Sequence, residues 1–146
     1  MRAVRSVIAA AVVAFGFAIP AQAQDLVIWW TKGVTEAEDN AFKAVVALWE
    51  KQTGKKADVS YYASGDTEAK TIPALKAGLP PDLTYDFSYD LAYTPTWAYD
   101  DLMADVSDVI EPIKDQIQPG VLDSLQFLNG KTGKKSYYAM PFAERY

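Results

Sequence analysis

The fold of this chain is decided by residues 25–31, which read DLVIWWT. Five consecutive apolar residues stand between Asp25 and Thr31. A short apolar run with polar ends is typical of a strand that is buried on both faces, as in a parallel sheet. The run ends in two tryptophans, and α/β proteins place their binding clefts at such strand ends. The run therefore predicts both a fold class and the edge of the sheet where a site should lie.

A helix is predicted directly after this strand. Thr35 precedes acidic residues, as an N-cap does, and apolar residues then recur with helical spacing over residues 36–53. Gly54 supplies the stop, because glycine readily adopts the left-handed conformation that ends many helices.

The alternation then continues. Residues 56–62 and 82–85 have strand character, and residues 67–77 form a second predicted helix, which Pro73 should bend or interrupt. The order β-α-β-α-β predicts an α/β fold, a three-layer lobe with a mainly parallel sheet and helices on its faces.

The signals beyond residue 85 are weaker. Residues 86–99 are rich in aromatic side chains and partly helical in pattern, and residues 112–117 and 120–128 also have helical character. Residues 125–129 and 136–140 can pair as a hairpin across a polar turn.

The first residues of the chain have the pattern of a secretory leader. Arg2 and Arg5 precede an apolar run over residues 7–19, and residues 21–23 read AQA. A membrane anchor is the alternative, but this run is shorter than the roughly 20 apolar residues that a span needs. We expect a signal peptide cleaved after Ala23 and a protein of the periplasm.

The composition narrows the possible partners. The sequence contains no cysteine, so neither a disulfide nor a lipid-bearing cysteine after the leader is expected. The net charge is −5, and loss of Arg2 and Arg5 with the leader takes it to −7. An acidic chain without a basic cluster is not predicted to bind nucleic acid or anionic membranes. It has no histidine, and neither a metal site nor a cofactor is predicted.

Two segments have some features of a phosphate-binding loop and of a calcium loop, but neither segment matches its motif. Residues 130–136 read GKTGKKS, but the glycine spacing of a phosphate-binding loop is missing and the segment leads into a predicted strand, so a solvated hairpin turn is expected. Asp82, Asp86 and Asp90 are spaced by four and do not match a calcium loop.

Hydrolysis of glycosides is an alternative function, because it needs two carboxylates across a cleft. The candidates at loop starts are Asp66, Asp86, Asp90 and Glu144. Acidic residues in such positions more often cap helices or accept hydrogen bonds from hydroxyl groups. We therefore predict no catalytic residue and no enzyme activity.

Aromatic residues stand at the end of each predicted strand: Trp29, Trp30, Tyr61, Tyr62, Tyr85, Phe87 and Tyr89. Polar side chains accompany them: Thr31, Lys32, Asp66, Asp86 and Asp90. Parallel strands end at one edge, so these groups should converge there. Rings that pack on C–H faces and carboxylates that accept from hydroxyl groups suit a neutral, hydroxyl-rich ligand. The alternative is that many of the rings are core residues, and Trp29 and Trp30 are equally good candidates for the exposed one because neighbours on a strand face opposite sides.

Five passages together resemble the extracellular solute-binding proteins of sugar ABC transporters, the family that includes maltose-binding protein. The entry strand at residues 26–30 is followed by WEKQTGK at 49–55, similar to the family's F-E-K-x-T-G-I-K-V passage. AGLPPDL at 77–83 is similar to its A-G-x-x-P-D-V passage. LNGK at 128–131 and YAMPF at 138–142 resemble the Y-N-G-K-x-Y-A-x-P hairpin.

The resemblance implies a type II periplasmic binding protein, in which two α/β lobes clamp a ligand and deliver it to a permease of the inner membrane. The implied ligand is a carbohydrate, either a sugar, an oligosaccharide or a sugar alcohol. By position, the resemblance and the strand-end argument together predict these ligand-binding residues: Trp30, Thr31, Lys32, Gly65, Asp66, Asp86, Phe87, Tyr89, Asp90, Phe142 and Glu144.

Members of this family are longer than this chain, so the resemblance implies an N-terminal fragment that acts as a monomer. The expected divisions are a signal peptide at 1–23, an N-terminal ligand-binding lobe at 24–128, and at 129–146 a hairpin with the start of a crossover to a missing second lobe. Two alternatives stay open: a fragment of a secreted glycosidase, or a binding protein for a polyamine or a peptide.

Overall fold

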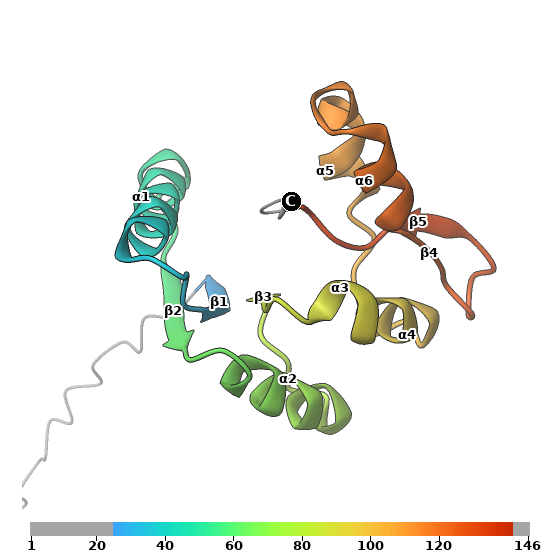
Figure 1. Ribbon diagram of the computed structural model, residues 1–146, viewed down its shortest axis with the longest axis horizontal. Helices are drawn as coiled ribbons and strands as arrows, with labels where there is room; N and C mark the ends of the chain where they lie inside the picture. The colour runs from blue at the N-terminus through green and yellow to red at the C-terminus, as the bar shows by residue number, and fades with distance from the viewer. Residues whose placement is uncertain (1–24, 142–146) are drawn as a thin grey trace, which may run out of the picture.

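The predicted parallel sheet is confirmed by the computed structural model, which describes residues 25–141 (Figure 1). Strand β1 (Leu26–Thr31) is central in a sheet of order β2-β1-β3. It pairs in parallel with β2 (Ala57–Tyr62) along its whole length and with β3 (Leu83–Tyr85) from Ile28 to Trp30. The first strand of the chain therefore lies at the middle of the sheet.

Helices α1 (Glu36–Thr53) and α2 (Asp66–Ala77) cover opposite faces of this sheet (Figure 1). Helix α1 has the predicted ends: the Glu38 amide donates to the Thr35 hydroxyl at 3.4 Å, and Gly54 closes the helix at a φ of 71°. Pro73 was expected to bend or interrupt α2, and the interruption is wrong, because the helix runs through that residue. Proline removes one hydrogen bond, and burial of Thr67 and Thr71 holds the rest of the helix in place.

The face of the sheet under α1 is apolar and aromatic. Ile28 and Trp30 of β1 pack against Phe42 of α1, and the rings of Trp30 and Phe42 stack with centroids 3.5 Å apart. Partly buried apolar side chains complete this cluster: Leu26, Val46, Ala57, Val59, Tyr61 and Tyr85. Full burial of one such side chain stabilises a fold by roughly 1.5–3 kcal/mol.

The most deeply buried side chains on the face under α2 carry hydroxyl groups, and the partly buried Val27 and Trp29 of β1 share that face. Thr31, Thr67 and Thr71 are almost completely buried, and the side chains of β1 that face α2 alternate with those that face α1. Thr67 and Thr71 are four residues apart in α2, so both lie on the side of the helix that contacts the sheet. Helix α2 is therefore held to the sheet by hydroxyl groups.

The remaining elements form a second unit beside the sheet (Figure 1). They are α3 (Tyr89–Ala92), α4 (Thr94–Tyr99), α5 (Ser107–Ile110), the 3₁₀-helix η1 (Glu111–Gln116), α6 (Pro119–Ser124), β4 (Gln126–Leu128) and β5 (Lys135–Tyr137). Ile110, Leu125 and Tyr137 form the core of this unit. Strands β4 and β5 pair antiparallel, which confirms the predicted hairpin.

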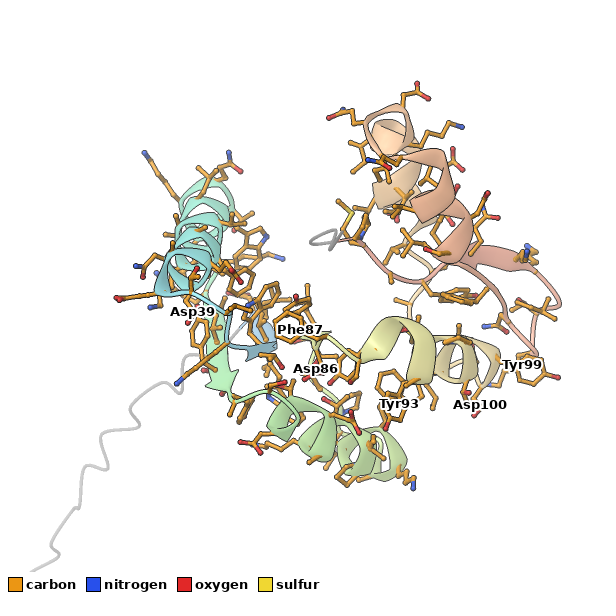
Figure 2. The ribbon with its side chains drawn as sticks, viewed as in Figure 1. Asp39, Asp86, Phe87, Tyr93, Tyr99 and Asp100 are labelled. Carbon is orange, nitrogen blue, oxygen red and sulfur yellow. The ribbon has the colours of Figure 1, made fainter. Side chains whose placement is uncertain are left out.

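The turn of this hairpin is docked on the end of α4. The Gly130 amide donates to the Tyr99 carbonyl at 2.9 Å, and Asn129 Nδ2 donates to Asp101 Oδ1 at 2.7 Å. A Cβ at position 130 would lie 2.8 Å from a carbon of the Tyr99 ring, which Figure 2 labels beside the turn. The position therefore needs glycine for close approach, while residues 131–135 are exposed as predicted.

No helix among residues 25–141 is both long enough and apolar enough to span a membrane. The predicted signal peptide at 1–23 lies outside the described residues.

Candidate functional site

The carboxyl ends of the three strands are joined by hydrogen bonds. The Lys32 amide, just beyond β1, donates to the Tyr62 carbonyl at the end of β2, at 2.9 Å. Thr31 Oγ1 donates to Asp86 Oδ2, one residue beyond β3, at 2.6 Å. The Gly65 amide, at the start of α2, helps to lower the pKa of Asp86. The predicted convergence of strand ends is therefore present in the described part of the chain.

Asp86 is the centre of this edge. It is 7% exposed, and its Oδ1 accepts from the Ser88 amide at 3.0 Å and from the Ser88 hydroxyl at 2.8 Å. Burial alone would raise the pKa of Asp86, but the hydrogen bonds from Thr31, Ser88 and Gly65 outweigh it and hold the pKa below its usual value. Asp86 is an ionised acceptor whose donors come from the end of β1, through Thr31, and from the loop after β3, through Ser88.

Thr31 and Thr67 continue this network into α2. Their hydroxyl oxygens lie 2.5 Å apart, and because Thr31 donates to Asp86, Thr67 is the donor to Thr31. Both side chains are inaccessible to solvent. Thr31 was predicted to contact ligand, but in this conformation its hydroxyl is buried and bonded to Asp86 and Thr67.

Trp30 was predicted to stack on the ligand, and the structure places its ring in the core instead. The ring is 6% exposed and stacks on Phe42 and on Tyr85, at centroid distances of 3.5 and 4.4 Å. The alternation of β1 explains this, because residue 30 shares the face of Ile28, which α1 covers. In this conformation the ring cannot serve as a platform for a ligand.

Phe87 lies in the loop after β3, at the carboxyl edge of the sheet, and is more exposed than Trp30. Its ring is half-buried and meets Tyr85 edge-on, with centroids 5.4 Å apart. Figure 2 shows Phe87 and Asp86 side by side between the sheet and α3. Three aromatic residues predicted to bind ligand have described side chains, and Phe87 is more exposed than the other two, Trp30 and Tyr89.

Tyr89, by contrast, is 8% exposed and packs inward. Its hydroxyl donates to Thr71 at 2.8 Å and lies 3.2 Å from the Thr84 hydroxyl, and its ring meets Trp97 edge-on. Burial raises the pKa of Tyr89 above its usual value, although its hydrogen bonds with Thr71 and Thr84 oppose this. Tyr89 joins α3 to the hydroxyl-rich face of the sheet.

The exposed predicted residues are Lys32, Gly65 and Asp66. Gly65 has a φ of 86° and precedes α2, so it turns the chain from β2 into the helix. Among residues 25–141, the side chains of Lys32 and Asp66 make no ion pair with each other or with any neighbour. They flank the buried network with opposite charges that are open to solvent.

Three predicted contacts cannot be placed fully. Asp90 belongs to α3, but its side chain is not described, and Phe142 and Glu144 lie outside the described residues.

Sequence reasoning missed three members of the network: Glu68, Ser88 and Tyr93. Glu68 accepts from the Ser88 hydroxyl at 2.9 Å and from the Tyr93 hydroxyl at 2.6 Å. An acidic residue in the first turn of a helix suggested only an interaction with the helix dipole, so the sequence held no signal for a contact 20 or 25 residues away.

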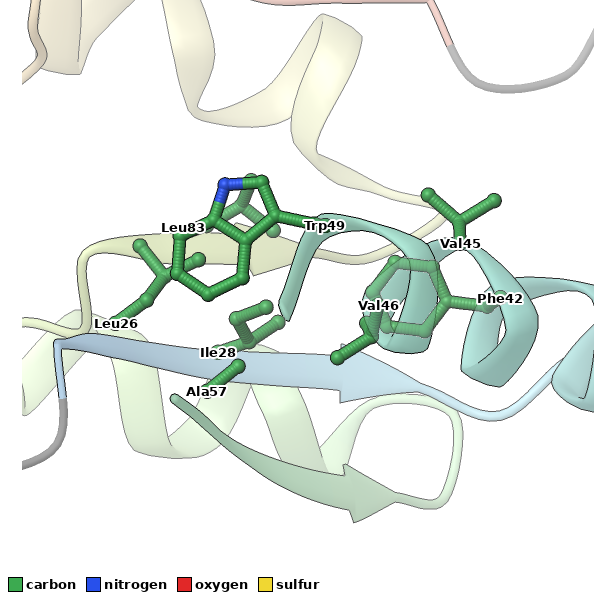
Figure 3. A pocket seen from close by; sticks show the side chains of 8 residues that line it. All are labelled: Leu26, Ile28, Phe42, Val45, Val46, Trp49, Ala57 and Leu83. Atoms are coloured by element: carbon green, nitrogen blue, oxygen red, sulfur yellow. The ribbon is translucent and has the colours of Figure 1, made fainter. Parts of the chain in front are cut away.

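An apolar groove of about 150 Å³ lies at the opposite, amino end of the sheet (Figure 3). Its lining comes from the first residues of the strands and from α1: Leu26, Ile28, Phe42, Val45, Val46, Trp49, Ala57 and Leu83. The lining offers no side-chain hydrogen-bonding group other than the Trp49 indole, so the groove does not suit a hydroxyl-rich ligand. Among the side chains that the structure describes, which do not include that of Asp90, no group of three or more acidic, histidine or cysteine residues could hold a metal ion.

The fold resembles that of a known binding protein. No protein-family model matches the chain. No curated protein matches it by sequence either. A crystal structure of an ABC transporter solute-binding protein from Thermotoga lettingae, bound with α-D-tagatose, is similar with a TM-score of 0.59 and 22% identity. The likeness covers 72% of this chain and 26% of that one, so the chain spans about a quarter of the length of that structure. The shared fold is that of a solute-binding protein lobe.

Proposed function

We propose that this chain is part of the substrate-binding component of an ABC importer and binds a carbohydrate at the carboxyl edge of its parallel sheet. The observation that carries the proposal is the fold shared with a sugar-bound solute-binding protein. The joined strand ends around Asp86 support it, because they gather polar and aromatic groups at the edge where open parallel sheets bind ligands.

The chemistry of the edge suits a hydroxyl-rich ligand. Lys32 can donate to ring or hydroxyl oxygens, and Asp66 can accept from hydroxyl groups. Phe87 offers a half-buried apolar surface for a C–H face. Thr31, Asp86 and Tyr89 act from inside the protein by holding these elements in place. Trp30 supports Tyr85, against which Phe87 rests.

The cellular setting belongs to the same proposal. The leader at 1–23 directs the protein to the periplasm, and a permease of the inner membrane is its transport partner. Residues 24–128 form the ligand-binding lobe, and residues 129–146 lead toward a second lobe. The protein acts as a monomer and does not catalyse a reaction. Incubation with oligosaccharides should therefore release no reducing sugar.

Calorimetry on the chain tests the ligand class. The panel is D-tagatose, D-glucose, maltose, sorbitol, spermidine and a neutral tripeptide. We expect a sugar or sugar alcohol to bind and the tripeptide not to bind. Binding of spermidine with no binding of any carbohydrate would replace the proposal by the polyamine alternative.

Two variants locate the site. Lys32→Ala and Asp66→Asn should each weaken carbohydrate binding by about tenfold to 150-fold, the range for a lost hydrogen bond to a charged group. Lys55→Ala is the matched control, because Lys55 is an exposed lysine near the amino end of the sheet. Equal affinities for all three variants would place the ligand elsewhere.

A further inference from the structure

Glu68 joins two segments that are distant in the sequence. Its Oε2 lies 2.9 Å from the Ser88 hydroxyl, in the loop after β3, and its Oε1 accepts from the Tyr93 hydroxyl at 2.6 Å. Figure 2 shows Tyr93 between α2 and the helices α3 and α4, where its ring stacks on Trp97 at 5.2 Å. Glu68 thus ties α2 to both ends of α3, because Ser88 directly precedes that helix and Tyr93 directly follows it.

Ser88 contacts two carboxylates with one hydroxyl proton. Its hydroxyl lies 2.8 Å from Asp86 Oδ1 and 2.9 Å from Glu68 Oε2. The Ser88 amide already donates to Asp86 at 3.0 Å, so the hydroxyl proton is available to Glu68. The two polar groups of Ser88 can therefore hold the loop from two sides, with the amide bonded to Asp86 and the hydroxyl to α2.

Phe87 lies between the two anchored residues. Asp86 is fixed by the strand ends, and Ser88 is fixed by Asp86 and Glu68. A backbone that is held on both sides of one residue presents that side chain in one orientation, which lowers the cost of ordering it when a ligand binds.

The geometry points to Glu68 as a positioning residue: by holding Ser88 and Tyr93 it fixes the loop that presents Phe87 to the carbohydrate. This inference rests on the proposed function for the ligand, but the anchoring itself is independent of it. Glutamine can replace Glu68 in this role. Its amide oxygen accepts from Tyr93, and its amide nitrogen donates to the Ser88 oxygen while Ser88 donates to Asp86.

Hydrogen exchange of the full chain tests the anchoring without a ligand. In Glu68→Ala, exchange of the Ser88 amide should become about tenfold faster, because a loop that loses an anchor opens more often. Glu68→Gln should keep the original rate. Asp123→Ala is the charge-matched control, since it removes an exposed carboxylate in α6. Ser88→Ala and Tyr93→Phe each remove one of the two hydrogen bonds to Glu68. If Glu68→Ala does not fold, faster exchange at residue 88 in these two variants tests the anchoring instead.

Calorimetry with D-tagatose on the same proteins tests the link to binding. The expected result is an affinity about tenfold weaker in Glu68→Ala and nearly unchanged in Glu68→Gln and Asp123→Ala. Unchanged exchange in Glu68→Ala would overturn the anchoring. Faster exchange with unchanged affinity would overturn the role in binding. If the unaltered protein bound no carbohydrate, the proposed function would fail, and the exchange rates would still decide the anchoring.

Discussion

The two faces of the parallel sheet are built by different physical means. Under α1, Ile28, Trp30 and Phe42 pack as a dry aromatic cluster. Under α2, the buried side chains Thr31, Thr67 and Thr71 are joined by hydrogen bonds to one another and to neighbouring elements. Apolar burial is proportional to area and has no direction, whereas a hydrogen bond requires its two atoms in one geometry. The α1 face therefore supplies stability, and the α2 face supplies the fixed positions around Asp86.

The largest effect is expected on the α1 face. Trp30→Ala should lower the free energy of unfolding by about 3–5 kcal/mol, because it removes a buried ring and leaves a cavity. Trp29→Ala is the matched control, since Trp29 is only half-buried and lies on the other face. Urea unfolding followed by circular dichroism measures both. A Trp30→Ala loss no greater than that of Trp29→Ala would contradict the assignment of the core to the α1 face.

The second effect concerns the hydroxyl network. Thr31→Val keeps the shape of the side chain but removes the donor to Asp86 and the acceptor for Thr67, so unfolding should become easier by about 1–3 kcal/mol. Thr31→Ser restores both hydrogen bonds and should recover most of that loss. If valine and serine behaved alike in chemical denaturation, the α2 face would be held by packing alone.

Acid should weaken the α2 face through Asp86. The pKa of Asp86 is lower in the folded state than in the unfolded chain, so its contribution is present above the unfolded value, about 3.9, and is lost as the pH falls below it. Urea midpoints measured from neutral pH down to acid should therefore fall more steeply for the native sequence than for Asp86→Asn. Parallel curves would mean that the three donors to Asp86 add nothing to folding.

The smallest effect distinguishes two neighbouring tyrosines on opposite faces. Burial, aided by Asp39, raises the pKa of Tyr61, whereas the hydrogen bond from Lys70 lowers the pKa of Tyr62. Lys70 Nζ lies 2.8 Å from the Tyr62 hydroxyl and 5.1 Å from the centre of the Trp29 ring. Lys70→Ala removes the hydrogen bond that lowers the pKa of Tyr62, so an ultraviolet titration should show that phenol ionising at a higher pH. The same change should lower the free energy of unfolding by about 0.5–1 kcal/mol, because the contact of Lys70 with the Trp29 ring is also lost. The same titration of Tyr62→Phe should lack that early-ionising phenol.

Much of the sheet could be predicted because its signals are local. Thr35 and Gly54 mark the ends of α1, and the apolar run at 26–30 marks the central strand, so each element is identified from its own residues. The choice between Trp29 and Trp30 was not local, because it depends on which face α1 covers.

The hydrogen bonds of Glu68 and Thr67 could not be predicted from the sequence, because they too depend on how separate elements pack. Glu68 meets Ser88 and Tyr93 only because α2 lies against both ends of α3, and Thr67 is buried only because β1 presents Thr31 to it. Pro73 was misleading because the helix lost one backbone hydrogen bond while its tertiary contacts remained. The strand-end residues Asp86 and Phe87 could be found because parallel strands must end together.

The apolar groove and the Asp86 network lie at opposite ends of the same strands. An apolar dye seated beside Trp49 and a sugar seated beside Phe87 would have no lining residue in common. The chain can accordingly be labelled, immobilised or followed by fluorescence at its amino edge while its carboxyl edge stays free. The length of strand β1 thus separates the apolar groove, where a label can be attached, from the proposed carbohydrate site.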